Sequence, residues 1–268
     1  FFATSGAQAL ALARQQPPDL VLLDAHMPGL SGFETCAAFK SDPALEHIPI
    51  LFVTSERSAE VEAAGYKAAI VGQKGFNGVA FLSHHAFDVT ARALPGAVED
   101  EPARYVEGRV FTPRGPLTVG GLYLPNGNPI GTEKFAYKLD WMKRLLSHAR
   151  DLLSREEMFV LCGDYNVCPT DMDVFDPKGF ANDALCQPES RAAFRKLLNL
   201  GLTDAVRAFH PDGEQYTFWD YQAGAWAKGN GLRIDHLLLS PQAADRLTAV
   251  GIDKAERGKT EPSDHVPV

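Results

Sequence analysis

The sequence predicts an α/β protein, because apolar runs typical of buried strands alternate along the chain with stretches typical of amphipathic helices. Hydrophobic residues make up 45% of the 268 positions and charged residues 22%, as in an ordinary globular protein with a sizeable core. No internal repeat or low-complexity tract interrupts the alternation. The length suits one large domain or two modest ones.

The first part of the chain predicts alternating helices and strands. Helices are expected at residues 6–14 and 31–40, and strands at residues 19–24 and 47–54. The first helix is rich in alanine and leucine, and Pro17 with Pro18 ends it. Both strand runs are apolar on their two faces, as a parallel sheet demands. The second helix places Phe33, Cys36 and Phe39 on roughly one face.

The alternation continues to the end of the chain. Strands are expected at residues 117–123 and 158–162, helices at 133–153 and 190–200, and a further helix from residue 240. The long helix has apolar residues near helical spacing. Ser190 can cap the helix that follows it, and Gly201 can end that helix. Pro241 occupies a first helical position, which favours a helix there.

Composition excludes several classes of protein. A net charge of −8 and a pI near 5.5 argue against a broadly basic nucleic-acid binder, although an enzyme with a local basic rim and a divalent cation remains compatible. Four cysteines without C-x-x-C spacing disfavour a zinc site or disulfide framework and favour a reducing cytoplasm. No apolar run reaches membrane-spanning length and no signal peptide is visible, so we expect no membrane contact. The abrupt ends suggest a fragment.

Residues capable of chemistry follow three of the apolar runs. Asp164 and Asn166 come directly after the strand at 158–162, and Asp235, Asp264 and His265 follow later in the chain. Acids, an amide and a histidine at strand ends are the components of metal-assisted hydrolysis of a phosphate ester. Each residue alone is more often an ordinary turn or capping residue. Their occurrence together, in this order, favours a catalytic site.

The first part of the chain resembles a known signalling domain. Its segments PPDLVLLDAHMPGLSGFE and IPILFVTS resemble the middle of a response-regulator receiver domain. The resemblance implies a partial, flavodoxin-like receiver segment over residues 1–57, with Asp24 as phospho-acceptor and Thr54 as the switch hydroxyl. The acidic pair that binds magnesium in that family, and its last elements, have no counterpart here. We therefore expect Asp24 to be a strand-end acid without phosphorelay chemistry.

Residues 58–268 resemble exonuclease III and the AP endonucleases of the endonuclease/exonuclease/phosphatase superfamily. The resemblance lies in GQKGFNGVAFLS, GLYLPNG, GDYNVCPTDMDV, TFWDYQAGAW, GLRIDHLLLS and SDHVPV. It implies an incomplete four-layered α/β sandwich. It also implies a cytoplasmic, monomeric DNA-repair phosphodiesterase that uses Mg²⁺ (or Mn²⁺). Its substrate would be double-stranded DNA, cut at abasic sites or trimmed from 3′ ends, as in base excision repair.

The same resemblance assigns catalytic roles. Asp164 would deprotonate or orient the attacking water, and Asn166 would position that water and the phosphate. His265 would donate to a phosphate oxygen, with its ring fixed by Asp235. Tyr123 would donate its hydroxyl to the phosphate or to the leaving oxygen.

Metal and substrate contacts are implied in the same way. The metal ligands would be Asp164, Asn166 and Asp264, since Mg²⁺ takes few carboxylates and completes its shell with water and substrate phosphate. Trp219 would pack at an extruded abasic sugar. Lys74 is a candidate contact to a backbone phosphate.

Two motifs of the nuclease family are absent: its first asparagine and the glutamate that is its principal metal ligand. When the sequences are aligned on Pro18 and Asp19, that glutamate falls on Ala25, and the alternation of side chains turns Asp24 away from the site. We therefore expect impaired activity. Two alternatives stay open. Instead of an impaired nuclease, the chain would then be a receiver-linked phosphorelay signalling module or an inactive chimeric fragment with a junction near residue 57.

Overall fold

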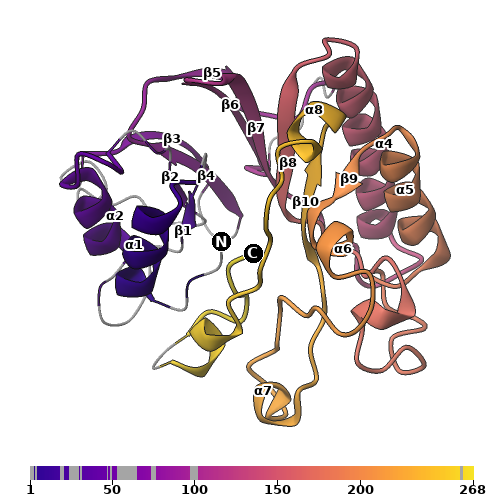
Figure 1. The fold of residues 1–268 in the computed structure, drawn as a ribbon. Helices are drawn as coiled ribbons and strands as arrows, with labels where there is room; N and C mark the ends of the chain where they lie inside the picture. The colour runs from indigo at the N-terminus through magenta and orange to yellow at the C-terminus, as the bar shows by residue number, and fades with distance from the viewer. Residues whose placement is uncertain are drawn as a thin grey trace.

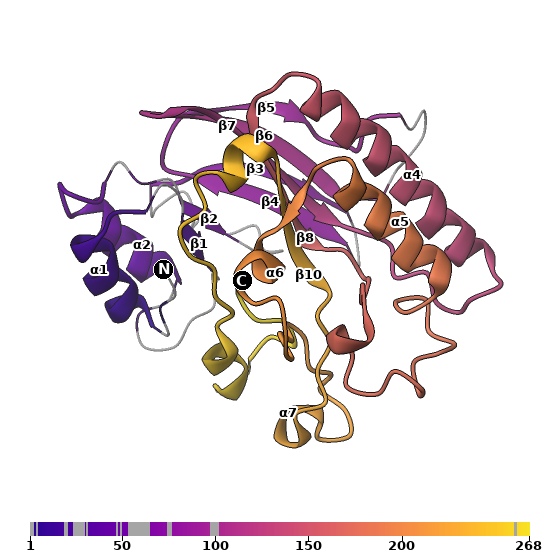
Figure 2. The same ribbon diagram turned by 45° about the vertical axis from the view of Figure 1, so that its right-hand side comes forward.

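A six-stranded sheet forms the centre of the protein, with helices on one face and an N-terminal layer on the other (Figure 1, Figure 2). The computed structural model describes residues 3, 5–18, 21–23, 30, 32–46, 48, 50–52, 65–73, 77–96, 102–259 and 262–268. These residues form both strands and helices, and a long helix joins the strands at 115–123 and 158–164, so the predicted α/β class is confirmed.

The central sheet has the strand order β5-β6-β7-β8-β10-β9. Its strands are β5 (Phe87–Ala91), β6 (Tyr105–Thr112), β7 (Gly115–Tyr123), β8 (Met158–Asp164), β9 (Thr203–Asp204) and β10 (Asp235–Leu239). The pair β7–β8 is parallel, and the long helix α4 (Glu133–Leu153) makes the crossover that parallel strands need. β10 runs antiparallel to β8. The carboxyl ends of β7 and β8 therefore meet the beginning of β10.

Helices α4 and α5 (Pro188–Asn199) cover one face of this sheet, as the apolar spacing of both segments predicts. Their buried core includes Trp141 and Leu145 of α4, Phe194 of α5, and Leu161 of β8. The remaining helical segments are η1 (Asp171–Asp173), α6 (Ala205–Phe209), α7 (Ala225–Lys228), α8 (Pro241–Ala244) and η2 (Lys254–Gly258). These short segments lie in the connections around the sheet.

The ends of two helices test the capping predictions. Ser240 caps α8 by accepting a hydrogen bond from the Ala243 amide, as expected. The prediction for Ser190 was wrong, because α5 begins at Pro188 and the buried Ser190 hydroxyl donates to the Ala184 carbonyl instead. Gly201, with a φ of 108°, follows the end of α5 and supplies the left-handed turn expected there.

The N-terminal layer consists of α1 (Gly6–Gln15), β1 (Val21–Leu23), α2 (Gly32–Lys40), β2 (Ile50–Phe52), β3 (Lys67–Gly72) and β4 (Gly78–Ser83). β1 and β2 pair in parallel, as predicted from their apolar runs. β3 and β4 form a separate antiparallel pair, so the strands of this layer form two pairs rather than one continuous sheet. Helices α1 and α2 lie outside these strands.

One apolar cluster spans the predicted domain boundary at residues 57 and 58. Tyr66 and Leu82 pack in the same buried cluster as Leu10, Cys36 and Ile48. The boundary itself and Thr54 lie in residues 53–64, outside the described part of the chain. The division into two domains therefore stays a prediction, although the described side chains on its two sides share a core.

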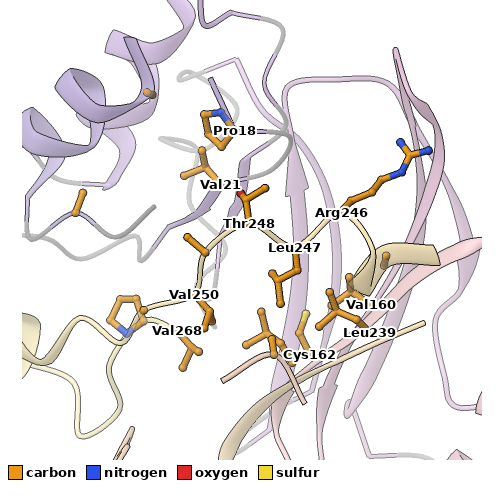
Figure 3. Close-up of a pocket in the computed structure, with 18 of the residues that line it drawn as sticks. Pro18, Val21, Val160, Cys162, Leu239, Arg246, Leu247, Thr248, Val250 and Val268 are labelled. Carbon is orange, nitrogen blue, oxygen red and sulfur yellow. The ribbon is translucent and has the colours of Figure 1, made fainter. Parts of the chain in front are cut away.

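A cavity of about 590 Å³ lies between the N-terminal layer and the central sheet (Figure 3). Val160 and Cys162 of β8 and Leu239 of β10 line one side, and Val21 with Val250 lines another. Of the helices in the described residues, none has the length and apolar character to cross a membrane.

A buried polar network attaches α4 to the sheet. The carboxylate of Glu107, 2% exposed on β6, accepts hydrogen bonds from Thr90, Tyr105 and His148, and the His148 Nε2 lies 2.6 Å away. Burial alone would raise the pKa of Glu107, but these three donors lower it. The ionised carboxylate is therefore the stable form in the folded protein.

We expect Glu107→Ala to lower the free energy of unfolding by about 3 kcal/mol, because it leaves the buried His148 and Tyr105 without their partner. Urea denaturation followed by circular dichroism measures this. Since the folded pKa of Glu107 is lowered, its contribution is present at neutral pH and disappears as the pH falls below its ordinary range. The control is Glu157→Ala, which removes a half-exposed ion pair with Arg109 and should cost less than about 1 kcal/mol. Equal losses in the two variants would contradict the account.

Candidate active site

Three strand ends bring the predicted catalytic residues together. In the sheet register, Asp164 at the end of β8 lies directly beside Tyr123 of β7 on one side and Asp235 of β10 on the other. His265 reaches the same place from the C-terminal segment, with its Nδ1 atom 2.9 and 3.1 Å from the two carboxylate oxygens of Asp235. The structure thus brings these four residues together, and their catalytic roles stay predictions.

Asn166 holds the carboxylate of Asp164. Its backbone N–H donates to Oδ1 of Asp164 at 2.7 Å, and its Nδ2 donates to Oδ2 at 2.8 Å. The residue adopts a left-handed backbone with a φ of 48°, which brings both donors to the same acid. Gly163 precedes the acid with a φ of 138°, and a Cβ there would lie 2.0 Å from the Leu122 carbonyl oxygen. Glycine is therefore required where β8 approaches β7.

The other hydrogen bonds of the Asn166 side chain modify its expected role. Its second Nδ2 hydrogen goes to the Leu124 carbonyl at 2.9 Å, and its Oδ1 accepts a hydrogen bond from Asn126 at 3.0 Å. No side-chain N–H of Asn166 remains to hold a water or a phosphate. The amide oxygen keeps one lone pair, so Asn166 can orient Asp164 and offer an oxygen ligand.

Asn126 and Thr217 are site residues that sequence reasoning missed. The Thr217 hydroxyl donates to Oδ2 of Asp235 at 2.6 Å and accepts from the backbone N–H groups of Ile234 and Asp235. Both residues lie inside motifs that were noticed, LPNG and TFWDY, but their types alone gave no reason to select them. They hold Asn166 and Asp235 respectively, and so fix groups one step removed from the reaction.

Burial and neighbouring charges shift the pKa values of three site residues. Burial raises the pKa of Asp164 to about 7, with Asp235 adding to the rise and His265 opposing it. Burial alone would lower the pKa of His265, but Asp235 and the neighbouring acids raise it to about 10. Burial alone would raise the pKa of Asp235, but its contact with His265 lowers it. At neutral pH the site therefore contains an ion pair of Asp235 and His265 beside a carboxyl group poised to exchange a proton.

Tyr123 keeps its proton in this environment. Burial and the nearby Asp164 raise the pKa of Tyr123, so its hydroxyl remains a donor at neutral pH. Arg104 fixes the end of the strand: its Nη1 donates to the Tyr123 carbonyl at 3.1 Å, and its guanidinium lies 4.9 Å from the centre of the tyrosine ring.

Two further predicted residues, Asp264 and Trp219, lie in different surroundings. Asp264 is half-buried beside the site, and its charge raises the pKa of both Tyr123 and His265. Trp219 is 2% exposed and packs edge-on against the ring of Trp226, so its burial gives no support to a contact with a sugar. Its predicted role in substrate binding stays a prediction.

Lys74 and Asp24 lie outside the described residues, and their predicted roles are not tested by the geometry.

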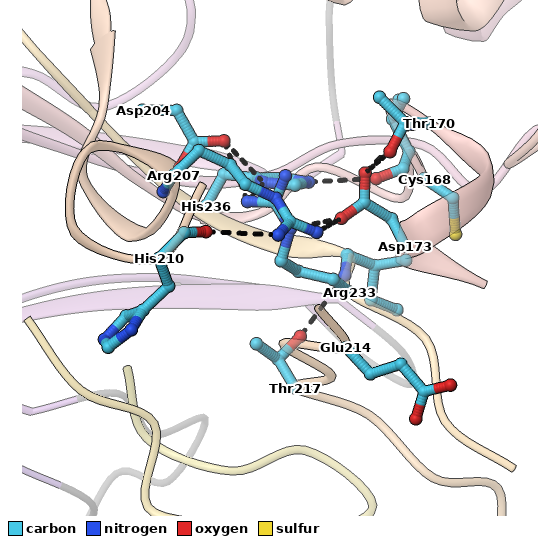
Figure 4. A network of polar contacts seen from close by, with 12 residues as sticks. Cys168, Thr170, Asp173, Asp204, Arg207, His210, Glu214, Thr217, Arg233 and His236 are labelled. Carbon is cyan, nitrogen blue, oxygen red and sulfur yellow. Dashed lines mark hydrogen bonds and ion pairs between the residues drawn. The ribbon is translucent and has the colours of Figure 1, made fainter. Parts of the chain in front are cut away.

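A second, largely buried network supports the start of β10 (Figure 4). Arg233, 1% exposed, donates from Nε to Oδ1 of Asp173 at 2.7 Å and from Nη1 to Oδ2 of Asp204 at 2.8 Å. The other Asp173 oxygen accepts from both the backbone and the hydroxyl of Thr170. His236 is fully buried next to this network and bonds to the Val167 carbonyl. This network fixes the strand that carries Asp235.

Oxygen donors for a cation are present, but few. Asp164, Asn166 and Asp264 supply two carboxylates and an amide oxygen, the donor types that Mg²⁺ prefers. Among the described residues, no group of three histidine, cysteine or acidic side chains gathers as a metal cage would. The donor set therefore fits a Mg²⁺ ion that takes most of its ligands from water and substrate phosphate.

We expect Asp235→Asn to lower the pKa of His265 from about 10 toward its ordinary value of 6.5, because the variant removes the nearest carboxylate. A histidine NMR titration measures this. A raised folded pKa means that the stability from this pair is present below the ordinary histidine pKa and is lost as the pH rises toward 10. Asp220→Asn, at an exposed aspartate of the neighbouring loop, is the control and should leave the titration unchanged. An unchanged His265 in Asp235→Asn would refute the assignment.

Comparisons with known proteins agree with this geometry. A family model described as "Endonuclease/Exonuclease/phosphatase family" matches residues 4–265. Exodeoxyribonuclease III of Haemophilus influenzae is 32% identical over 215 residues, which cover 77% of this chain and 80% of the relative. The 3′ phosphatase NExo from Neisseria, solved with a product DNA hairpin, is 30% identical with a TM-score of 0.78, over 92% of this chain and 96% of that one. An AP endonuclease from Archaeoglobus fulgidus is 29% identical with a TM-score of 0.77 and the same coverage.

These matches also bear on the first part of the chain. The family match begins at residue 4 and the structural matches cover 92% of the chain, so both extend into the segment expected to resemble a receiver domain. They give a receiver segment at residues 1–57 no support. The chain belongs to the endonuclease/exonuclease/phosphatase family, and within it to the phosphodiesterases of the exodeoxyribonuclease III and AP endonuclease type.

Proposed function

We propose that this chain hydrolyses phosphodiester bonds of double-stranded DNA at abasic sites and 3′ ends, with Mg²⁺ or Mn²⁺ as cofactor. The observation that carries the proposal is the convergence of Asp164, Asp235 and His265 at adjacent strand ends. The names of the similar proteins agree in substrate: an exodeoxyribonuclease III, an AP endonuclease, and a 3′ phosphatase with a DNA hairpin. All three names concern phosphate esters of DNA.

The proposed chemistry uses the charges of the site. Asp164, whose carboxylate is held by two hydrogen bonds from Asn166, accepts the proton of the attacking water. His265, held as a cation by Asp235, donates to a non-bridging phosphate oxygen, where negative charge develops. Tyr123 donates its hydroxyl to the phosphate or to the leaving oxygen. Thr217 holds Asp235, and Asn126 holds the Asn166 side chain that orients Asp164, so little reorganisation accompanies the reaction.

In this proposal Asp164, Asp264 and the amide oxygen of Asn166 hold the divalent cation. When bound, the cation neutralises charge on the phosphate oxygens. The proposal includes weak binding of the cation and a reduced rate, because two carboxylates and one amide oxygen are few protein ligands. This reduction is the impairment expected from the absence of the family's glutamate, which aligns with Ala25.

Cleavage of abasic-site DNA tests the function. We expect nicking with Mg²⁺ and none with EDTA, followed on a labelled duplex in a denaturing gel. Asp164→Asn should reduce the rate at least about a hundredfold, because it removes the general base. The matched control is Asp171→Asn, since Asp171 has a 70% exposed side chain and pairs only with Arg191 in the described residues. Its rate should stay within about twofold of the unmodified chain. Nicking that does not depend on the metal, or an equal loss of rate in Asp164→Asn and Asp171→Asn, would contradict the proposal.

Restoring the missing ligand tests the impairment. We expect Ala25→Glu to lower the Mg²⁺ concentration needed for half-maximal nicking and to raise the rate on the order of tenfold, since an added carboxylate strengthens cation binding. Ala25→Gln has nearly the same size without the charge and serves as the control. If both variants match the unmodified chain across a Mg²⁺ titration, Ala25 does not occupy the position of the family's glutamate. Ala25 lies outside the described residues, so this expectation rests on the sequence alignment alone.

Three further expectations from the sequence stay separate from the proposed phosphodiesterase activity. They are phosphoryl transfer to Asp24, a cytoplasmic location and a monomeric state. No contact in the described part of the chain favours a phosphorelay role, because Asp24 and its neighbours lie outside it. We therefore advance the phosphodiesterase alone.

A further inference from the structure

A fully buried lysine lies behind the candidate active site. Lys138 of α4 is 0% exposed, and its ammonium donates to backbone carbonyls of three separate loops. The acceptors are Asn126 at 2.9 Å, Asn166 at 2.5 Å and Ala184 at 3.2 Å. None of the ion pairs found among the described residues includes Lys138. The three N–H groups of its ammonium therefore all bind backbone carbonyls, and these bonds link the three loops to one another.

Burying an ammonium group is costly, so its partners must compensate for lost water. Burial lowers the pKa of Lys138 to about 8, and the nearby Asp164 opposes the fall, so the charged form still predominates at pH 7. Three carbonyl dipoles around one cation satisfy all its N–H groups. An apolar side chain would fill the same space without this cost. The charge therefore has a use other than packing.

The loop after β7 is shaped to fit this side chain. Gly127 has a φ of 90°, and a Cβ at this position would lie 2.6 Å from Cδ of Lys138. Only glycine both adopts this backbone and leaves room for the lysine stem. The Asn126–Gly127 turn thus wraps around Lys138, which explains why the LPNG motif needs its glycine.

The loop after β8 depends on the same ammonium. The left-handed backbone of Asn166 turns its carbonyl toward Lys138, while its N–H and Nδ2 point to Asp164. Asparagine tolerates this conformation better than other non-glycine residues, but the carbonyl that it turns inward is buried and needs a hydrogen-bond donor. Lys138 provides that donor, and it also holds Asn126, whose side chain donates to Asn166.

We propose that Lys138 is a positioning residue for phosphodiester hydrolysis: it sets the Asn126 and Asn166 backbones, and these orient the Asp164 carboxylate. The proposal rests on the proposed function for its catalytic consequence. Lys138 touches no substrate and acts through Asn166. Its removal should therefore lower kcat and leave KM nearly unchanged.

The test compares Lys138→Met with Leu152→Ala. Methionine keeps the length of the side chain and removes its charge. Leu152 is buried on the same helix, fourteen residues further on, so its truncation destabilises the fold at about 20 Å from Lys138 along the helix axis. We expect kcat on abasic-site DNA with Mg²⁺ to fall about a hundredfold in Lys138→Met, with KM within about twofold. Leu152→Ala should lower the melting temperature and keep kcat.

Hydrogen exchange gives a measurement independent of activity. Peptides covering residues 124–128 and 164–168 should exchange faster in Lys138→Met and at the unmodified rate in Leu152→Ala. If Lys138→Met does not fold, Gly127→Ala replaces it, because its added methyl displaces the lysine stem without removing the charge. The same loss of kcat and faster exchange are expected.

The outcomes separate the two proposals. If the unmodified chain does not nick abasic DNA with Mg²⁺, the proposed function fails, and hydrogen exchange alone decides the role of Lys138. Unchanged exchange in both loops, a kcat within twofold of the unmodified chain, or an equal loss of kcat in Leu152→Ala would overturn the role assigned to Lys138.

Discussion

The register of β8 between β7 and β10 is the constraint on which the site depends. Asp164 stands beside Tyr123 across a parallel pairing and beside Asp235 across an antiparallel one. A shift of one residue in either pairing would turn one of these side chains to the other face of the sheet. Gly163 permits the close approach of β8 to β7 at this point. The buried Arg233 network fixes the start of β10. The strand pairing thus places the catalytic side chains side by side, as the proposed reaction requires.

Two short relays of hydrogen bonds then hold the reactive groups. One runs from Asn126 through Asn166 to Asp164, and the other from Thr217 to Asp235 and His265. Each buried donor or acceptor in them has a partner, and leaving one unmatched would cost about 1–3 kcal/mol. Supporting groups of this kind orient reactive side chains before substrate arrives. One of these chains of hydrogen bonds ends at the Asp164 carboxylate and the other passes through the Asp235 carboxylate, where the proposed reaction needs proton transfer and charge stabilisation.

Sequence reasoning identified four of the strands (β1, β2, β7 and β8) and the reactive residues, because these have local signals. Apolar runs marked β7 and β8, and unusual polar residues directly after a strand marked Asp164 and Asn166. Supporting residues lacked such signals. Asn126, Thr217 and Lys138 are ordinary types at ordinary spacings, and their importance comes from contacts with loops distant in sequence. Ser190 failed as a cap for a similar reason, since its partner is the Ala184 carbonyl six residues earlier. The burial of Trp219 likewise follows from a loop packing on itself, which no local pattern shows.

The cavity beside β8 and β10 makes the two faces of the sheet differ in how they accept a change of side-chain size. The face toward α4 is packed by one large apolar cluster. On the other face, the buried cluster around Phe81, Val119 and Val160 borders a partly open cavity of about 590 Å³. A larger side chain forces neighbours to move in a close-packed core, whereas next to a cavity it can grow into the space. The strand that ends in Asp164 is therefore more tolerant of added volume on the side of the N-terminal layer than on the side of α4.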